Sequence, residues 1–161
     1  MLFVDVVAST QIVCRCGDVE WAGLLHQHAR AMQAVVRRHH GRVRAFLGDG
    51  FLFQFDEAGD ALTAALRMHH AASVQDLFEI RMGLDHGPVV DFGDDWAVGL
   101  TLHVASRLTD WCRPSEIAVT DRCYAAARRS IAIPPAADVT VQLRGVDTAT
   151  SAHVIRSGVL R

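Results

Sequence analysis

Residues 42–55 read RVRAFLGDGFLFQF, in which two apolar runs are separated only by Gly48-Asp49-Gly50. A glycine-rich turn between two such runs predicts a β-hairpin. The apolar, β-branched run LFVDVV at 2–7 predicts an earlier strand. Between residues 18 and 40, apolar residues recur at helical spacing, and Gly41 follows as a helix-ending glycine does. The first third of the chain therefore predicts a strand, a helix and a hairpin.

The same patterns continue to the end of the chain. The remaining predicted elements are a helix at 58–74, two strands around the Gly87-Pro88 break, a helix at 99–112, a strand at 116–120, a short helix at 121–129 with Asp121 placed to cap it, and strands in 139–145 and 151–156. The opening half is a βαββαβ unit of ferredoxin-like order. We expect one α/β (α+β) domain over residues 1–161, with a mainly antiparallel sheet covered by helices.

Composition narrows the classes of function. The 161 residues carry a net charge of −2, and all sixteen basic residues are arginine. No field of one sign invites nucleic acid or an anionic membrane. No apolar run approaches membrane-spanning length, and the first residues lack the basic leader of a signal peptide. The four cysteines lack paired zinc-site spacing, which favours reduced thiols. We expect a cytoplasmic domain, and a strand that begins at residue 2 is compatible with a fragment of a longer chain.

Two carboxylates stand out. Asp5 lies within an apolar strand, where an unpaired buried charge is costly, and Asp49 lies at the hairpin tip. In a βαββ unit the first strand lies beside the hairpin, so both carboxylates can converge at one end of the sheet. Such oxygen ligands suit Mg²⁺ or Mn²⁺, and Ser9 and Thr10 follow where backbone N–H groups can meet phosphates. The alternative is that Asp49 is a turn residue and Asp5 pairs locally.

Several blocks of sequence occur in a recognisable order. They are FVDVVAST, GRVRAFLGDGFLFQF, IRMGLDHGPVV, VGLTLHVASRL, EIAVT and LRGVD, spread over residues 2–156. Together they resemble the class III adenylate and guanylate cyclases, and several co-linear blocks are far more specific than one motif. The resemblance implies a homodimer that converts a nucleoside triphosphate to a 3′,5′-cyclic nucleotide and pyrophosphate.

The resemblance also assigns roles to residues. Asp5 and Asp49, with the backbone of Val6, match the positions that bind two divalent ions. The partner subunit contributes the rest: Arg107 matches the arginine facing the α-phosphate, and Arg144 matches a residue that binds the terminal phosphates. His103 stands where the family usually has a ribose-contacting asparagine.

The base-reading positions depart from the family. Adenylate cyclases commonly have a lysine where Ala45 stands and an Asp or Thr where Trp96 stands, and this chain has no lysine. Three interpretations follow. The chain is an active cyclase that takes a pyrimidine, as the cyclases of bacterial antiphage signalling do; or it is an adenylate cyclase with unconventional contacts; or it is a degenerate domain that dimerises or binds nucleotide without turnover.

Overall fold

The computed structural model describes residues 1–75, 78–93 and 97–156 of the chain. The helices are α1 (Ser9–Cys16), α2 (Asp18–Arg38), α3 (Ala58–Gln75), α4 (Leu100–Trp111) and α5 (Asp121–Ala127). The strands are β1 (Leu2–Val6), β2 (Arg42–Leu47), β3 (Gly50–Gln54), β4 (Ile80–Leu84), β5 (Val90–Asp91), β6 (Ala97–Val98), β7 (Glu116–Thr120), β8 (Ala137–Val141) and β9 (Thr150–Arg156). The structure confirms the predicted fold class.

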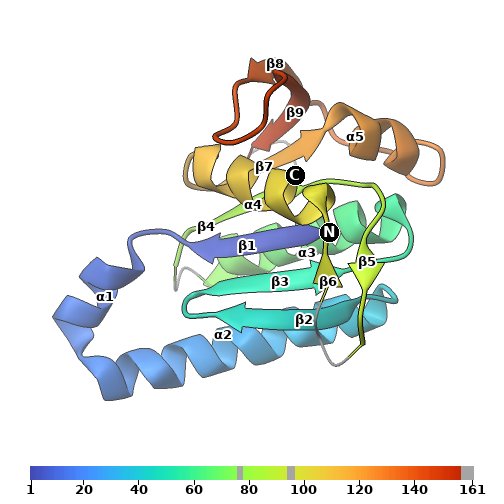
Figure 1. Cartoon of the computed structure of the whole chain (residues 1–161). Helices are drawn as coiled ribbons and strands as arrows, with labels where there is room; N and C mark the ends of the chain where they lie inside the picture. The colour runs from blue at the N-terminus through green and yellow to red at the C-terminus, as the bar shows by residue number, and fades with distance from the viewer. Residues whose placement is uncertain (76–77, 94–96, 157–161) are drawn as a thin grey trace.

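Seven strands form one sheet in the order β2-β3-β1-β4-β7-β9-β8. All neighbours pair antiparallel except β4 and β7, which are parallel. The small β5–β6 ladder lies apart from this sheet and in front of it (Figure 1). The predicted hairpin, β2 and β3, lies beside the first strand as expected, because β3 pairs with both β2 and β1.

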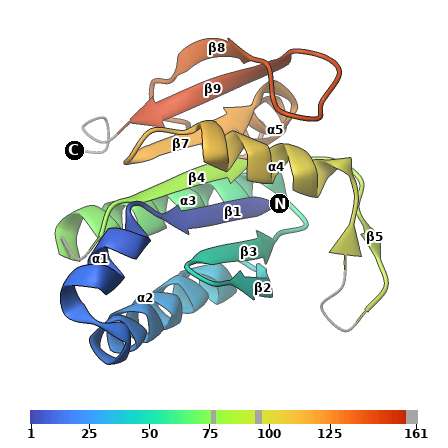
Figure 2. The ribbon, with the colours of Figure 1, turned by 60° about the vertical axis from the view of Figure 1, so that its left-hand side comes forward.

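One face of the sheet holds the main core. The strand residues Leu2, Val4, Phe51 and Phe53 are almost wholly buried there, in one cluster with side chains of α2, α3 and α5. Side chains alternate across a strand, so the residues between them, such as Phe3, point to the opposite face. That opposite face is the one that α4 covers (Figure 2).

Helix α4 lies unusually close to the strand beneath it. Gly83 of β4 is fully covered, and a Cβ atom on it would collide with the carbonyl oxygen of Ala105 and with Thr109. Ala105 also packs against Leu52 and Met1. Helix α4 therefore rests on bare strand backbone, which only a glycine allows at this point.

The structure corrects four local predictions. Residues 9–16 form helix α1, a helix that the sequence analysis did not predict; none of its residues is fully buried, and Ile12 packs against the main core as a partly buried residue. The cap of α5 is Thr120, whose hydroxyl accepts from the Cys123 N–H, and Asp121 falls in the first turn. Strand β8 spans Ala137–Val141, so it begins two residues earlier and ends four residues earlier than the strand predicted at 139–145. The short strand β6 was not predicted.

A buried carboxylate ties the end of β4 to α5. Asp85 has no exposed surface and accepts hydrogen bonds from the Thr120 hydroxyl at 2.7 Å, the Arg122 Nε at 2.7 Å and the His86 N–H at 2.9 Å. A buried charge with this many donors is compensated, which is what its burial requires.

Candidate active site

The two aspartates predicted to bind metal lie at the same end of the neighbouring strands β1 and β3. Asp5 is opposite Gly50 in the β1–β3 register, and Asp49 immediately precedes Gly50 in the two-residue turn of the hairpin. Gly48 provides the positive φ of 72° that this turn needs. Val6 follows Asp5 at the end of β1, so its backbone lies beside the same turn.

Asp5 is paired with an arginine that sequence analysis did not single out. Arg81 lies directly across from Asp5 in the β1–β4 register, and its Nε and Nη2 atoms lie 2.8 Å and 2.7 Å from the same carboxylate oxygen, Oδ2. A third nitrogen, Nη1, donates to the carbonyl oxygen of Asp110 at 3.2 Å, at the end of α4. The alternation of β4, Ile80-Arg81-Met82, could have placed Arg81 on the same face as Asp5.

The oxygen ligands that Asp5 and its neighbours offer fit a hard divalent cation. Asp5 and Asp49 offer carboxylate oxygens and Val6 offers a carbonyl oxygen; such oxygens suit Mg²⁺ or Mn²⁺, which fill their other positions with water and phosphate. Over the described residues no group of three or more His, Cys, Asp and Glu side chains gathers into a denser site. The Arg81 guanidinium shows that the Asp5 carboxylate attracts a cation in this fold.

Ser9 and Thr10 lie in the first turn of α1, directly after the carboxylate end of β1. The residue before them, Ala8, adopts a left-handed conformation (φ 56°), and no side chain caps the helix. The first N–H groups of a helix lack intrahelical acceptors and carry partial positive charge. They therefore suit an anion such as a phosphate group.

His103 and Arg107 are one turn apart on α4. His103 is exposed, and Arg107 is partly exposed with its Nη1 donating to the Asp110 carboxylate at 3.2 Å. Among the described contacts, Arg107 pairs with Asp110 and not with Asp5 or Asp49. The two predicted halves of the site are therefore not joined through Arg107 within one chain.

Arg144 is exposed in the turn after β8, at the opposite edge of the sheet from β2. Its neighbours Leu143 and Val146 pack in the cluster that contains Val104 and Leu108 of α4. The turn therefore belongs to the α4 side of the molecule, like His103 and Arg107.

The base-reading positions are only partly described. Ala45 pairs with Leu52 and packs in the cluster of Ala105 under α4. Trp96 lies outside the described residues. Next to Ala45, at an irregularity in the β2 register, buried Arg44 donates to the Asp91 carboxylate of β5 at 2.8 Å. This pair lowers the pKa of Asp91 and links the β5–β6 ladder to the sheet.

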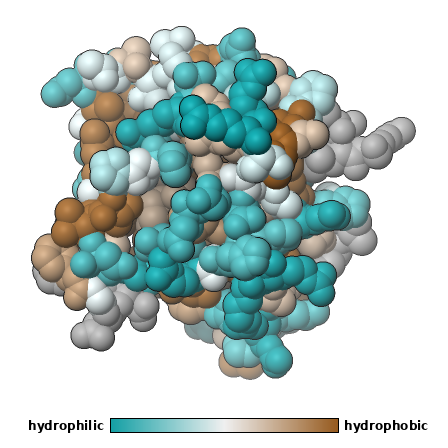
Figure 3. All heavy atoms as spheres, turned by 90° about the vertical axis from the view of Figure 1, so that its right-hand side faces the viewer, coloured by the Kyte–Doolittle hydropathy of each residue, from teal (hydrophilic) through white to brown (hydrophobic). Residues whose placement is uncertain are grey.

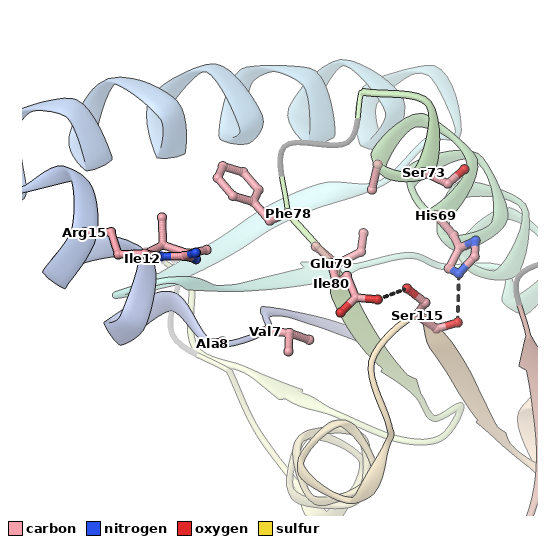
Figure 4. Close-up of a pocket in the computed structure, with 11 residues that line it drawn as sticks. Val7, Ala8, Ile12, Arg15, His69, Ser73, Phe78, Glu79, Ile80 and Ser115 are labelled. Atoms are coloured by element: carbon pink, nitrogen blue, oxygen red, sulfur yellow. Dashed lines mark hydrogen bonds between the residues drawn. The ribbon is translucent and has the colours of Figure 1, made fainter.

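A cavity of about 510 Å³ lies on the other side of the sheet, and none of the predicted site residues lines it. Figure 4 shows Ile12 and Arg15 of α1 on one side and His69 of α3 on another, with Glu79 and Ser115 between them. The Ser115 hydroxyl donates to Glu79 at 3.2 Å. The cavity thus borders the end of β1 that carries Asp5, where Val7 and Ala8 line it, but it lies toward α3 and not toward α4.

The cysteines offer no reactive thiol in the core. All four are free, and burial raises the pKa of both Cys112 and Cys123 to about 12. In the described part of the chain, no helix combines the length and hydropathy needed to cross a membrane.

Comparisons with known proteins identify the family to which this chain is similar. Residues 1–156 match the family described as the adenylate and guanylate cyclase catalytic domain. An adenylate cyclase of Streptomyces coelicolor is 30% identical over 124 residues, which cover 76% of this chain and 32% of that protein. An adenylate cyclase of Streptomyces griseus is 32% identical over 125 residues, 76% of this chain and 31% of that protein. The chain spans about a third of the length of these curated relatives.

Solved structures share the fold. The adenylyl cyclase CyaB from P. aeruginosa superposes with a TM-score of 0.83 at 21% identity, covering 97% of this chain and 92% of that one. The guanylate cyclase domain of RhGC from Catenaria anguillulae, solved in complex with GTP, gives a TM-score of 0.79 at 19% identity, covering 96% and 94%. With the family match over nearly all of its length, the chain belongs to the adenylate and guanylate cyclase catalytic domain family.

Proposed function

We propose that this domain is an active nucleotide cyclase that forms a 3′,5′-cyclic nucleotide and pyrophosphate at a homodimer interface. The observation that supports the proposal is the register of β1 and β3, which pairs Asp5 with Gly50, the residue after Asp49; α1 begins four residues after Asp5. Family membership supports cyclisation of a nucleoside triphosphate, and the two carboxylates support a mechanism that uses divalent ions.

The residues divide the work between two chains. When bound, two divalent ions supply activation of the ribose 3′-hydroxyl and neutralisation of the triphosphate charge. Asp5, Asp49 and the Val6 carbonyl hold the ions, and the first N–H groups of α1, at Ser9 and Thr10, bind phosphate oxygens. From the partner chain, the guanidinium at position 107 faces the charge that develops at the α-phosphate. The ribose contact falls to position 103, and the terminal phosphates to position 144.

Exposed apolar residues support dimerisation through the α4 face. Phe92, Val98 and Leu100 lie within nine residues of one another along the β5–β6 ladder and the start of α4, and Phe92 and Leu100 are 59% and 60% exposed. The molecular face nearest β5 is mostly hydrophilic but carries hydrophobic side chains toward its edges (Figure 3). Apolar side chains of this size gain stability when a second subunit covers them.

For the base, we propose a non-standard contact set around Ala45 and Trp96. Ala45 lies in an apolar cluster and brings no charged or hydrogen-bonding side chain to the sheet. An indole at position 96 would fill part of the purine space, which favours uracil or cytosine over the conventional reading of adenine. Adenine recognition through other groups is the second candidate.

The deciding experiment uses the purified domain with Mn²⁺ and each of the four ribonucleoside triphosphates in turn. We expect one cyclic product, identified by mass spectrometry, with pyrimidine triphosphates preferred. Cyclic AMP as the main product would support the unconventional adenylate cyclase. If no triphosphate yields a cyclic product, the degenerate interpretation holds instead, and stabilisation against heat by a triphosphate with Mn²⁺ distinguishes a nucleotide-binding domain from one that only dimerises.

Mixing two inactive variants tests the shared site. Asp5→Ala and Arg107→Ala should each lose activity, because each removes one half of both sites in the homodimer. A heterodimer of the two contains one intact site, so the mixture should regain part of the wild-type rate. A mixture that stays inactive while the wild type turns over would contradict the shared-site arrangement.

A further inference from the structure

Arg81 makes two kinds of contact at once. Its Nε and Nη2 hold Oδ2 of Asp5 at 2.8 Å and 2.7 Å, and its Nη1 reaches the Asp110 carbonyl at 3.2 Å. The Arg81 and Asp5 side chains are 30% and 26% exposed, so water and ions reach this pair. It is therefore a pair that a dissolved cation can compete for.

The second contact lies at the end of α4. The last carbonyls of a helix lack intrahelical donors and carry partial negative charge, so the guanidinium is a favourable partner there. The carboxylate of the same Asp110 accepts from Arg107 Nη1 at 3.2 Å. Asp110 is thus held at its backbone by Arg81 and at its side chain by Arg107.

We propose that Arg81 is a built-in counter-ion that competes with a divalent cation for Asp5 and transmits the cation's arrival to the end of α4. The inference rests on the proposed function, because it takes Asp5 as a metal ligand. Arg81 is a positioning residue here, acting through Asp5 and through the helix that carries Arg107.

The physical reason is charge. A guanidinium and a divalent ion on one carboxylate oxygen repel each other, so metal entry weakens the Nε and Nη2 contacts. Arg81 is then left with its helix contact and must shift. Because Arg107 completes the site shared with the second chain, metal at one site of the dimer changes the setting of Arg107 at the other.

The test measures Mn²⁺ binding to the intact homodimer by calorimetry, without nucleotide. Arg81→Gln removes the competing charge while keeping a polar side chain, and we expect it to bind Mn²⁺ about tenfold more tightly than the wild type. A purely structural role would loosen the site and weaken binding. Unchanged or weaker binding by the folded variant would overturn the inference.

Arg42→Gln is the matched control. Arg42 is also an arginine paired with a carboxylate, Asp56 at 2.9 Å, but it lies at the start of β2, far along the strand from Asp49. Its loss should leave the Mn²⁺ affinity unchanged. A tightening equal to that of Arg81→Gln would mean that overall charge, and not the Asp5 pair, sets the affinity, which also overturns the inference.

Asp5→Asn separates this inference from the proposed function. If Asp5→Asn loses Mn²⁺ binding while Arg81→Gln matches the wild type, the metal site stands and the counter-ion role fails. If Asp5→Asn binds Mn²⁺ as the wild type does, or the wild type binds none, both fail.

A measurement on the wild type covers the case in which Arg81→Gln does not fold. In ¹⁵N-labelled protein, titration with Mg²⁺ should shift the Arg81 Nε–H signal together with the amides of residues 110–112. An Arg81 signal that stays fixed at saturating Mg²⁺ would overturn the inference.

Discussion

The two faces of the sheet formed by the hairpin and its neighbour β1 differ in burial and in charge. Toward α2 and α3, Val4 and Phe53 are packed at 1% exposure or less. Toward α4, the same strands carry Asp5 and Ala45, and charged groups remain partly exposed. The alternation of side chains along these strands thus places the packed core on one face and the proposed chemistry on the other. Substitutions on the two faces should therefore fail in different ways.

The largest expected effect is on the chemical side. Asp49→Ala should lower the cyclase rate by roughly a thousandfold or more, because it removes one of the two carboxylates proposed to hold the ions that neutralise the triphosphate charge. Asp49 lies in the hairpin turn and does not belong to the packed core, so its free energy of unfolding should change by less than about 1 kcal/mol. Steady-state rates and urea unfolding of the same preparation test both statements.

The partner substitution is Phe53→Ala, four residues along the same hairpin. Phe53 is fully buried and stacks on Phe51 with ring centroids 6.2 Å apart. Truncating it should cost about 3–5 kcal/mol of unfolding free energy, through lost burial and the cavity left behind. Below the midpoint of denaturation, the rate per folded molecule should stay within a few-fold of wild type. A rate loss as large as that of Asp49→Ala would remove the distinction between the faces.

A smaller effect concerns pH on the core side. His28 of α2 is buried edge-on against Phe51 and Phe78, and its Nε2 has no hydrogen-bond partner. Burial lowers the pKa of His28 from 6.5 to about 4. Between these values the unfolded chain binds a proton that the folded chain does not, so stability is lost as pH falls. The loss should reach about 3 kcal/mol at pH 4.

His28→Leu isolates this contribution. The variant should lack the part of the acid destabilisation between pH 6.5 and 4, as measured by urea unfolding at several pH values. An unchanged pH profile would show that other groups cause the acid sensitivity. His103, on the chemical face and exposed, makes His103→Gln a suitable comparison, which should leave the unfolding profile unchanged.

Much of the fold could be predicted because its signals are local. The Gly48-Asp49 turn, the alternation of β1 and the helical spacing of α2 each depend on neighbouring residues, and their elements formed as expected. Helix α1 was missed because it is only eight residues long and none of them is fully buried, so its apolar pattern is short. The Thr120 cap was misplaced by one residue because Thr and Asp both serve at helix starts.

The site could be predicted only as far as its residues lie on predictable elements. The position of Asp5 and Asp49 at one end of neighbouring strands follows from the strand order, and the register pairs Asp5 with Gly50, the residue after Asp49. The pairing of Asp5 with Arg81 depends on which strand becomes the second neighbour of β1, which local patterns do not determine. The contact between Arg81 and the end of α4 depends further on how that helix lies over the sheet.

Helix α4 rests on the backbone of Gly83, so main-chain geometry fixes its height above the sheet. The spacing is therefore insulated from changes in the size of side chains elsewhere in the core. Changes in the side chains that pack against α2 and α3, as sequences diverge, would leave the distance between Arg107 and the sheet unchanged. A single methyl group at residue 83 would push α4, and the Arg107 guanidinium with it, away from the sheet.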